Sequence, residues 1–567
     1  MAENQGLLGR LLVSTGLVKE EQVSRILAAI AENEGGVVGA AVAVAGISEE
    51  ELLRKLADKL AMDYVDLSGE KPSEEVVRLL PSSAAFQYNV VPVSLVDGTL
   101  VIATSDPFNT TMSDGLRLSV DKPIRLALAP RRDIEKAARK LYGVGADTLD
   151  AMTREGSIVD IDADSEFSKN DISELGQEAS IVKFVNQIIA EADRQGATDI
   201  HFEPMEDELR IRYRIDGILH KVDMPPQLNR LQAAITSRLK VMANLDIAEK
   251  RMPMDGRIGI RVNGEDIDIR VSTMPTAYGE SVSLRLLQKS GSMVKLQDLG
   301  MQPDDEALIT KLIHRPNGII LVTGPTGSGK STSLYAFLQE INRMDVRILT
   351  AEDPIEYEMP GINQVAVKSD IGLTFARILR AFLRQDPDIC MVGEIRDAET
   401  AEIAINASLT GHLVLSTLHT NDSAGAFARL IDMGVEPFLV ASAVSGVLAQ
   451  RLVRRLCKEC KAPEIIADRT RRGIVLPEIL APGTTIYEPV GCEKCGGTGY
   501  KGRGGIFELL HVTEALESLI ISRRPSADIR RVAIEQGMHT LREDGFRNVL
   551  NGVTTLGEVL RVTEDSE

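Results

Sequence analysis

The chain has 567 residues and an ordinary globular composition, with 44% hydrophobic, 26% charged and 4% aromatic residues and no Trp. Its 64 Lys and Arg against 83 Asp and Glu give a formal net charge of −19. Roughly three or four domains are expected from this length, and the negative charge with few aromatic rings argues against a nucleic-acid-binding protein.

A run of about 18 apolar residues, which a membrane-spanning helix needs, does not occur in the sequence. The opening stretch MAENQGLLGRLLVSTG lacks the basic front and the cleavage site of a secretory signal. We therefore expect a cytoplasmic protein. Thiols stay reduced in that compartment, so paired cysteines are interpreted as metal ligands or redox catalysts rather than as disulfides.

Residues 1–145 are expected to form an N-terminal α+β domain with a degenerate repeat at 6–60. The segment LGRLLVSTGLVKEEQV (8–23) resembles VGAAVAVAGISEEEL (38–52), at an offset of 38 − 8 = 30 residues. Each copy predicts a short helix, a Gly stop and an acidic helix start.

Two further patterns lie in the same domain. YNVVPVSLVDGTLVIATSDP (88–107) places apolar runs on both sides of Asp97 and Gly98, which is typical of a β-hairpin. PRRDIEKAARKLYG (130–143) predicts a helix that ends at its final glycine.

The segment 146–179 carries ten acidic and two basic side chains, which predicts a linker to a second α+β domain at 180–295. SIVKFVNQIIAEADRQGATDIHFEP (180–204) predicts a helix, a Gly stop and a strand. In LRIRYRIDG (209–217) apolar side chains alternate with three arginines. These arginines therefore share one face of a strand, which is either a solvated outer face or a basic face directed at an anion.

A phosphate-binding loop is predicted in NGIILVTGPTGSGKSTSLYAFLQEIN (317–342), where a buried strand, a Gly-rich turn and a helix follow one another. Glycines let backbone N–H groups surround phosphates, and the helix N-terminus adds partial positive charge. Lys330 would contact the phosphates, and Ser331 would bind Mg²⁺. The expected nucleotide-binding residues are Gly324, Pro325, Thr326, Gly327, Ser328, Gly329, Lys330, Ser331 and Thr332.

Hydrolysis also needs a carboxylate, and two apolar strands downstream end in acidic residues. RILTAEDPIEYE (347–358) contains Glu352, Asp353 and Glu356, and PDICMVGEIRD reaches Glu394. In α/β sheets, sites form at the carboxyl ends of the strands, and a carboxylate there can polarise water or hold Mg²⁺ through its waters. Any one of these acidic residues can instead be a helix cap or a surface charge.

The stretch GHLVLSTLHTND (411–422) predicts a third strand, with His412 and His419 at its opposite ends. A histidine in such a place is either a satisfied structural side chain or, at the polar end of the strand, a sensor of a γ-phosphate. The pattern alone favours neither interpretation.

Taken together, GPTGSGKST, AEDPIEY, RQDPDICMVGEIRD and GHLVLSTLHTND closely resemble the Walker A, Asp-box, Walker B and His-box motifs of secretion ATPases. These are the hexameric motors of type II secretion and type IV pilus assembly. The resemblance covers about 180–563 and, more loosely, 50–107. It implies a multidomain α/β chain with a PAS-like α+β domain at 180–295 and a RecA-like P-loop ATPase domain at 296–567.

The resemblance also implies roles for individual residues. ATP and Mg²⁺ would be bound by the P-loop, with Glu356 positioning water and Glu394 as the Walker B glutamate. His412 and His419 match the His box. In the family, arginines of the second domain contact a nucleotide, often across a subunit boundary, and the candidates here are Arg212, Arg214, Arg270 and Arg285.

The implied partners follow from the same resemblance. We expect a homohexamer, peripheral association with the cytoplasmic face of the inner membrane, and contact with a secretion or pilus platform protein. The 1–145 domain would dock on a cytoplasmic domain of a membrane partner.

Four of the five cysteines form the pairs Cys457 and Cys460, in CKEC, and Cys492 and Cys495, in GCEKC. The arrangement C-x₂-C-x₃₁-C-x₂-C favours four thiolates around one Zn²⁺. A redox couple and accidental core cysteines are the alternatives. Many assembly ATPases of the family carry such a tetracysteine lobe, and retraction ATPases lack it.

The 31 residues between the pairs exceed the usual zinc-site spacing of about 15–20, so we expect a protruding lobe at about 455–500. The preceding stretch AQRLVRRL (449–456) is interpreted as a basic helix end that joins this lobe to the ATPase domain. Cys390, inside a predicted buried strand, is expected to be a plain core cysteine.

The expected function is an ATPase motor that assembles a pseudopilus for type II secretion, with type IV pilus assembly as the alternative client. The N-terminal repeat also resembles modules that bind cyclic-di-GMP, although Leu7 stands where Arg is usual. A P-loop scaffold that binds ATP without turnover is a further interpretation, which Glu356 and Glu394 disfavour.

Overall fold

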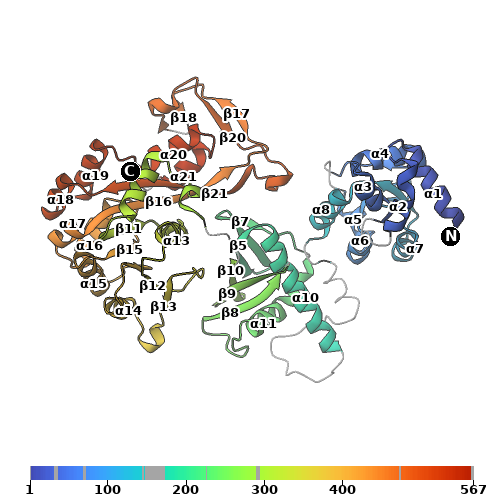
Figure 1. The fold of residues 1–567 in the computed structure, drawn as a ribbon. Coiled ribbons are helices and arrows are strands. Elements are labelled where there is room, and N and C mark those ends of the chain that lie inside the picture. Colours follow the sequence, from blue (N-terminus) through green and yellow to red (C-terminus); the bar gives the residue numbers. More distant parts are fainter. Residues whose placement is uncertain are drawn as a thin grey trace. The chain divides into compact units, whose positions relative to one another are not determined.

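A computed structural model describes residues 2–30, 36–67, 72–143, 146, 173–224, 226–262, 264–288, 294–471 and 474–563 (Figure 1). The chain divides into two compact units, 1–288 and 289–567, and each is described by itself. Among the residues that the structure describes, no helix is long and apolar enough to cross a membrane.

The first unit begins with two helix pairs. The predicted repeat is confirmed: in each copy a helix ends near a glycine with positive φ, 78° at Gly16 and 66° at Gly46, and an acidic helix follows. Leu12, Ile26 and Leu52 are fully buried between these helices. The four helices are α1 (Ala2–Ser14), α2 (Glu20–Ala29), α3 (Gly36–Ala45) and α4 (Glu49–Leu60).

A four-stranded sheet of order β1-β4-β3-β2 follows. The predicted hairpin is confirmed, since β2 and β3 pair antiparallel across Asp97 and Gly98, whose φ angles of 49° and 75° permit a tight turn. The predicted helix at 130–143 is also present. The elements are β1 (Asp63–Tyr64), α5 (Glu74–Arg78), α6 (Ser82–Tyr88), β2 (Val90–Val96), β3 (Thr99–Thr104), α7 (Thr110–Ser119), β4 (Ile124–Leu128) and α8 (Arg131–Tyr142).

The helix α10 (Ser173–Arg194) begins before residue 180, so the linker predicted at 146–179 is wrong at its C-terminal end. Acidic residues stabilise the N-terminus of a helix, so an acidic stretch does not by itself indicate a linker. Most of the predicted linker, residues 147–172, lies outside the described residues.

A six-stranded sheet of order β7-β6-β5-β10-β9-β8 completes the first unit. Helices α10 and α11 lie on one face of it (Figure 1). Their apolar side chains pack against the sheet, and the arginines of β6 lie on the other face, as their alternation predicts. The elements are β5 (Ala197–Pro204), β6 (Leu209–Ile215), β7 (Ile218–Lys221), η2 (Pro226–Leu231), α11 (Gln232–Met242), β8 (Met254–Val262), β9 (Glu265–Thr276) and β10 (Gly279–Gln288).

The second unit is built on a seven-stranded sheet of order β13-β12-β14-β15-β11-β16-β21. Neighbouring strands are parallel except β21, which is antiparallel to β16. The carboxyl ends of the parallel strands therefore meet at one edge. The strands are β11 (Gly318–Thr323), β12 (Ile348–Glu352), β13 (Asn363–Ala366), β14 (Ile389–Val392), β15 (Leu413–Leu418), β16 (Val444–Leu456) and β21 (Tyr500–His511).

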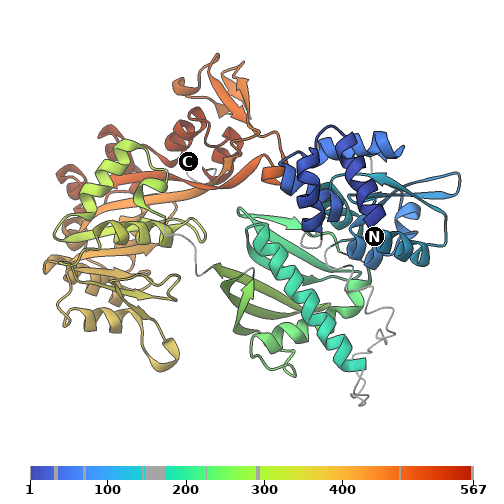
Figure 2. The ribbon, with the colours of Figure 1, turned by 45° about the vertical axis from the view of Figure 1, so that its right-hand side comes forward.

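Helices cover both faces of this sheet (Figure 2). Two apolar cores form against it. Cys390 is fully buried in one of them, as expected. The helices are η3 (Leu296–Asp298), α12 (Pro303–Ile313), α13 (Lys330–Ile341), η4 (Ser369–Ile371), α14 (Phe375–Phe382), α15 (Ala398–Leu409), α16 (Gly425–Asp432), α17 (Pro437–Ala443), α18 (Glu514–Ile521), α19 (Ser526–Glu535), α20 (Leu541–Leu550) and α21 (Leu556–Thr563).

The stretch 449–456 is part of strand β16, so the helix end predicted there is wrong. Its apolar and basic residues fit a helix as well as a strand. Pairing with β11 on one side and β21 on the other decides the conformation, because tertiary context overrides a weak local preference.

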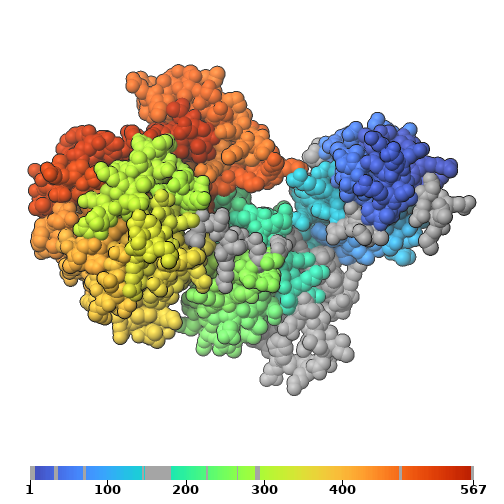
Figure 3. Space-filling model, in the orientation of Figure 1, coloured from blue at the N-terminus to red at the C-terminus, as the bar shows by residue number. Residues whose placement is uncertain are grey.

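The lobe between the cysteine pairs contains short antiparallel strands and projects from the second unit (Figure 3). Its base is anchored, because Ile466, Leu480 and Ile486 pack with apolar residues of α20 and α21. The elements are β17 (Ala462–Ile465), β18 (Thr470–Arg471), β19 (Ile474–Val475), η5 (Glu478–Leu480), β20 (Thr485–Glu488) and η6 (Glu493–Cys495).

A buried ion pair holds β16 against α21, and its loss should destabilise the second unit. Glu558, 3% exposed, pairs with Arg454 and Arg561 at 2.8 Å each. Burial by itself raises the pKa of Glu558. The hydrogen bonds from Arg561 and Arg454 outweigh this effect and lower the pKa to about 2. We expect Glu558→Gln to cost about 3 kcal/mol of unfolding free energy at pH 7, measured by urea unfolding.

The pH dependence has a definite sign. A carboxylate with a lowered folded-state pKa stabilises above its unfolded pKa and loses that contribution as pH falls through the folded value. The difference between wild type and Glu558→Gln should therefore shrink between about pH 4.5 and pH 2. A difference independent of pH over that window would contradict the ion-pair assignment.

Candidate active site and metal centre

The predicted P-loop connects β11, which is wholly buried, to the start of α13 at Lys330. A Cβ at Gly324, whose φ is 146°, would lie 2.6 Å from the Gln450 carbonyl oxygen, so only glycine fits there. The Lys330 ammonium donates to the carbonyls of Gly324 at 2.8 Å and Pro325 at 3.1 Å. Burial lowers the pKa of Lys330, and the charge of Arg451 lowers it further.

A cavity of ≈150 Å³ lies beside this loop at the carboxyl edge of the sheet. It brings together side chains from five separate stretches of the chain. Five of the residues predicted from the sequence line it: Lys330, Ser331, Glu356, Glu394 and His419.

Glu394 follows β14, and both of its carboxylate oxygens have a partner at the cavity. Its side chain is 13% exposed, with one oxygen 2.5 Å from Arg396 Nη2 and the other 3.4 Å from His419 Nε2. Thr417 donates to the neighbouring Gly393 carbonyl at 2.7 Å and fixes the turn. A carboxylate held in this way can accept a proton from water or orient it.

The acidic residues after β12 have different environments. Glu352 is 4% exposed and accepts from Thr350 at 2.5 Å, from Gln364 at 3.0 Å and from the Tyr335 hydroxyl, so its oxygens are occupied. The Tyr335 hydroxyl in turn accepts the Glu356 N–H at 3.1 Å. Burial and the Glu352 charge raise the pKa of Tyr335. Glu352 and Tyr335 therefore position the turn that carries Glu356.

His412 is not part of this cluster. It precedes β15, and its Nδ1 lies 2.8 Å from the Ala407 carbonyl, at the sheet edge opposite the P-loop. Seven residues of extended chain place it about 23 Å from His419. Of the two histidines, the structure brings only His419 to the cavity.

The four candidate arginines lie together on the open face of the six-stranded sheet. Arg214 and Arg285 both neighbour Asp199 in register, and Arg270 neighbours Arg285. Asp199 accepts from Arg285 at 2.9 Å and lies 3.7 Å from Arg214. Arg212 pairs with Glu203. This face thus carries several closely spaced guanidinium groups with two carboxylates between them.

Two residues that touch the P-loop were not predicted. Gln450 and Arg451 on β16 are 2% and 7% exposed, and the Gln450 amide donates to the Ser328 carbonyl at 2.7 Å. The sequence carries no motif for them. Their stretch resembles a helix, and only the pairing of β16 with β11 places them beside the loop.

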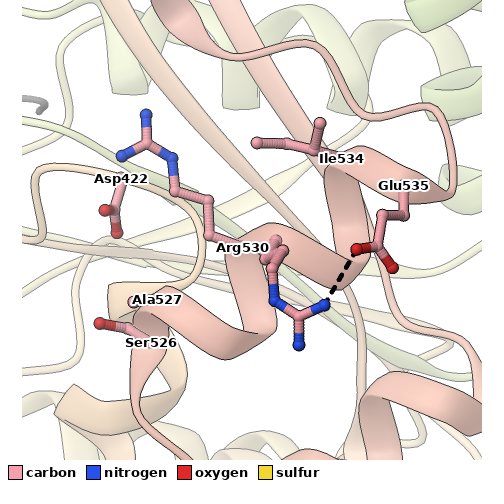
Figure 4. A pocket seen from close by; sticks show the side chains of 7 residues that line it. Asp422, Ser526, Ala527, Arg530, Ile534 and Glu535 are labelled. Atoms are coloured by element: carbon pink, nitrogen blue, oxygen red, sulfur yellow. Dashed lines mark hydrogen bonds and ion pairs between the residues drawn. The ribbon is translucent and has the colours of Figure 1, made fainter.

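A second cavity of ≈470 Å³ is larger but contains none of the predicted residues. Asp422 and three residues of α19, Ser526, Arg530 and Glu535, are among the residues that line it (Figure 4). Arg531 pairs with Glu535 at 2.9 Å, and Asp422 caps the Gly425 N–H at 2.7 Å. Asp422, Arg531 and Glu535 are thus engaged in local contacts. The smaller cavity, which collects the predicted residues, is the better candidate active site.

The four paired cysteines meet in one place. Their sulfur atoms lie within 4.8 Å of one another, with distances of 3.8 Å (Cys457–Cys492), 3.9 Å (Cys460–Cys495) and 3.7 Å (Cys492–Cys495). Four thiolates about 2.3 Å from one tetrahedral ion are about 3.8 Å apart. The residues present therefore fit a tetrahedral metal ion.

The surroundings favour a thiolate at Cys495. Burial raises its pKa, but N–H groups of Cys492 and Gly499, 3.1 and 3.2 Å from its sulfur, contribute to lowering it to about 6. Burial raises the pKa of Cys460 to about 11. A bound cation would favour the thiolate form of all four side chains.

Comparison with known proteins identifies relatives over the whole length. The family described as Type II/IV secretion system protein matches residues 174–561, and the MshEN domain matches 60–148. The type IV pilus assembly ATPase PilB of Myxococcus xanthus is 42% identical over 562 residues, covering 98% of each chain. The type II secretion system protein E of Xanthomonas campestris pv. campestris is 41% identical over 574 residues, covering 98% of this chain and 97% of that protein.

Among solved structures, the pilus retraction motor PilT with bound ADP is similar over 67% of this chain and 96% of its own, at 27% identity and a TM-score of 0.44. The ATPase DotB of Legionella pneumophila is similar over 72% of this chain and all of its own, at 20% identity and a TM-score of 0.48.

The geometry of the four sulfurs predicts one metal ion per chain. Elemental analysis of freshly purified protein should find about one equivalent, and Cys460→Ser should lose most of it because three thiolates remain. Cys390→Ala is the matched control, since this cysteine lies in the core of the sheet and should leave the metal content unchanged. Far less than one equivalent of metal per chain in the wild-type protein would contradict the metal assignment.

Proposed function

The chain belongs to the family of type II/IV secretion system proteins, and we propose that it is a hexameric ATPase motor that assembles a pseudopilus for type II protein secretion. The observation that carries the proposal is the cavity where Lys330, Ser331, Glu356, Glu394 and His419 converge. Phosphate-binding and carboxylate groups at one sheet edge suit phosphoryl transfer to water.

The residues divide the work of hydrolysis. The P-loop backbone and Lys330 bind and orient the phosphates of ATP, and the Ser331 hydroxyl would hold Mg²⁺. Mg²⁺ supplies charge neutralisation on the phosphates. Glu394 orients the attacking water and accepts its proton, while Glu356 helps to position that water. His419, in contact with Glu394, responds to the γ-phosphate.

The arginine face of the first unit would complete the site from a neighbouring subunit. Several guanidinium groups on one rigid sheet suit a nucleotide triphosphate, and arginines supplied in this way speed hydrolysis in other NTPases by about 10³–10⁵. Arg212, Arg214, Arg270 and Arg285 are the candidates. This arrangement requires an oligomer, and a ring of six copies would place one arginine face at each boundary.

The remaining parts take roles outside the chemistry. The proposed division is a partner-docking domain at 1–145, a linker up to α10, a PAS-like domain at 180–295 and a RecA-like domain at 296–567. The strand order β7-β6-β5-β10-β9-β8 with helices on one face supports the PAS-like description. Zn²⁺ at the four cysteines would cross-link the base of the lobe.

We further propose that the motor is cytoplasmic and works at the inner face of the inner membrane, against a platform protein and the cytoplasmic domain of a membrane partner. Nucleic acid is not among its partners. Type IV pilus assembly is the alternative client, since proteins named for each system are similar over nearly the whole chain. Binding of cyclic-di-GMP by the N-terminal domain stays a prediction.

The enzyme assignment predicts separable effects of two substitutions. Lys330→Ala should abolish ATP binding and turnover because the phosphates lose their main cation. Glu394→Gln should retain ATP binding and lower the rate of phosphate release by about 10²–10⁴. Phosphate release and binding of a fluorescent ATP analogue measure the two effects. Equal background rates for wild type and Lys330→Ala would refute hydrolysis.

The two histidines provide a second comparison. His419→Ala should lower the rate of phosphate release by about tenfold or more, because His419 contacts Glu394. His412→Ala should have a much smaller effect, because its ring contacts the Ala407 carbonyl at the opposite edge of the sheet. Similar losses in both variants would show that the His box acts as a unit despite this separation.

A further inference from the structure

Strand β16 lies directly against the P-loop. It pairs with β11 up to Thr323 and Ala449, so the next residues, Gln450 and Arg451, pass beside the loop where it leaves the sheet. A Cβ on Gly324 would approach the Arg451 guanidinium to 3.2 Å, and one on Gly329 would approach the Gln450 amide to 3.1 Å. The two side chains therefore fill the space behind the loop.

Gln450 binds the P-loop itself. Its side chain is 2% exposed, accepts from the Ser333 hydroxyl at 2.8 Å and donates to the Ser328 carbonyl at 2.7 Å. One amide thus connects the loop to the first turn of α13. An apolar side chain of the same size would leave both groups without these partners in a buried place, which is costly.

Arg451 connects strand β16 to the loop that follows β15. It is 7% exposed, and its guanidinium donates to the Gln450 carbonyl at 3.1 Å and to the Asn421 carbonyl at 2.9 Å. Asn421 stands two residues after His419. A planar guanidinium can hold two acceptors in fixed directions, which the single ammonium of lysine cannot do.

The segment 419–423 is tied down at three points. The Thr420 N–H donates to Thr323 Oγ1 at 2.9 Å, Arg451 holds Asn421, and Ser423 donates to Glu508 from its N–H at 2.9 Å and its hydroxyl at 2.5 Å. Glu508 is 1% exposed on β21. His419 itself remains half exposed at the cavity. The segment is therefore held in place by buried hydrogen bonds, and the His419 imidazole at its start stays accessible from the cavity.

We infer that Gln450 and Arg451 are positioning residues with separate tasks in the proposed hydrolysis. Gln450 sets the shape of the P-loop and thereby the binding of the phosphates. Arg451 sets the position of the segment that carries His419 and thereby the chemical step at Glu394. The inference rests on the proposed ATPase function. It goes beyond that function by assigning roles to two residues that support the site from behind.

The test is to measure KM and kcat for ATP hydrolysis in variants of Gln450 and Arg451. Gln450→Met should raise KM by about tenfold or more and leave kcat within about threefold. Arg451→Met should lower kcat by about tenfold or more and leave KM within about threefold. Arg451→Lys should also lower kcat, because lysine keeps the positive charge but cannot hold both carbonyl oxygens in fixed directions. Recovery of the wild-type kcat by Arg451→Lys would overturn the bridging role.

The matched control is Arg454→Lys, on the same strand but paired with Glu558 and touching neither loop. It should lower stability and leave kcat and KM as in the wild type. If Arg451→Met does not fold, as judged by circular dichroism and gel filtration, Ser423→Ala removes the hydroxyl bond between the same segment and Glu508 and should lower kcat alone.

The outcomes are distinct. The inference fails if the Gln450 and Arg451 variants change KM and kcat by the same factor, or if both behave like Arg454→Lys. A wild-type protein that does not turn over ATP would instead refute the proposed function. The two failures can be told apart, because the variants are compared only with a wild-type protein that hydrolyses ATP.

Discussion

The parallel pairing of β11 with β15 on one side and β16 on the other is the constraint on which the rest of the site depends. Parallel strands end at the same edge of a sheet, so each loop that follows one of them reaches the same place. Lys330 follows β11, and His419 follows β15. The close approach at Gly324 leaves no room for a side chain between the P-loop and β16.

The cluster of four cysteines, the candidate metal site, lies at the end of the same strand. β16 continues past Gln450 and Arg451 to Leu456, and Cys457 is the next residue. Its partner β21 starts at Tyr500, soon after Cys495. Four sulfurs around one ion would therefore hold the ends of β16 and β21 together. Further along β16 lie Gln450 and Arg451, the residues behind the P-loop. The lobe and the site share one piece of secondary structure.

The arginine face follows a different principle. Its members come from β6, β9 and β10, and they meet because side chains directly across antiparallel strands lie on the same face. Asp199 and Glu203 separate some of the guanidinium groups and reduce their mutual repulsion. The arginine face belongs to a unit distinct from the one that holds the P-loop.

Local patterns determined much of this protein. The Gly-rich loop between a strand and a helix, the hairpin at Asp97 and Gly98, and the paired cysteines each depend on residues close in sequence, so their chemistry is visible there. The tertiary structure alone decided which distant residues meet. It brought His419 to Glu394, occupied Glu352 with buried donors, and made 449–456 a strand beside the P-loop. Pairing between strands is a long-range interaction, and single-sequence periodicity does not record it.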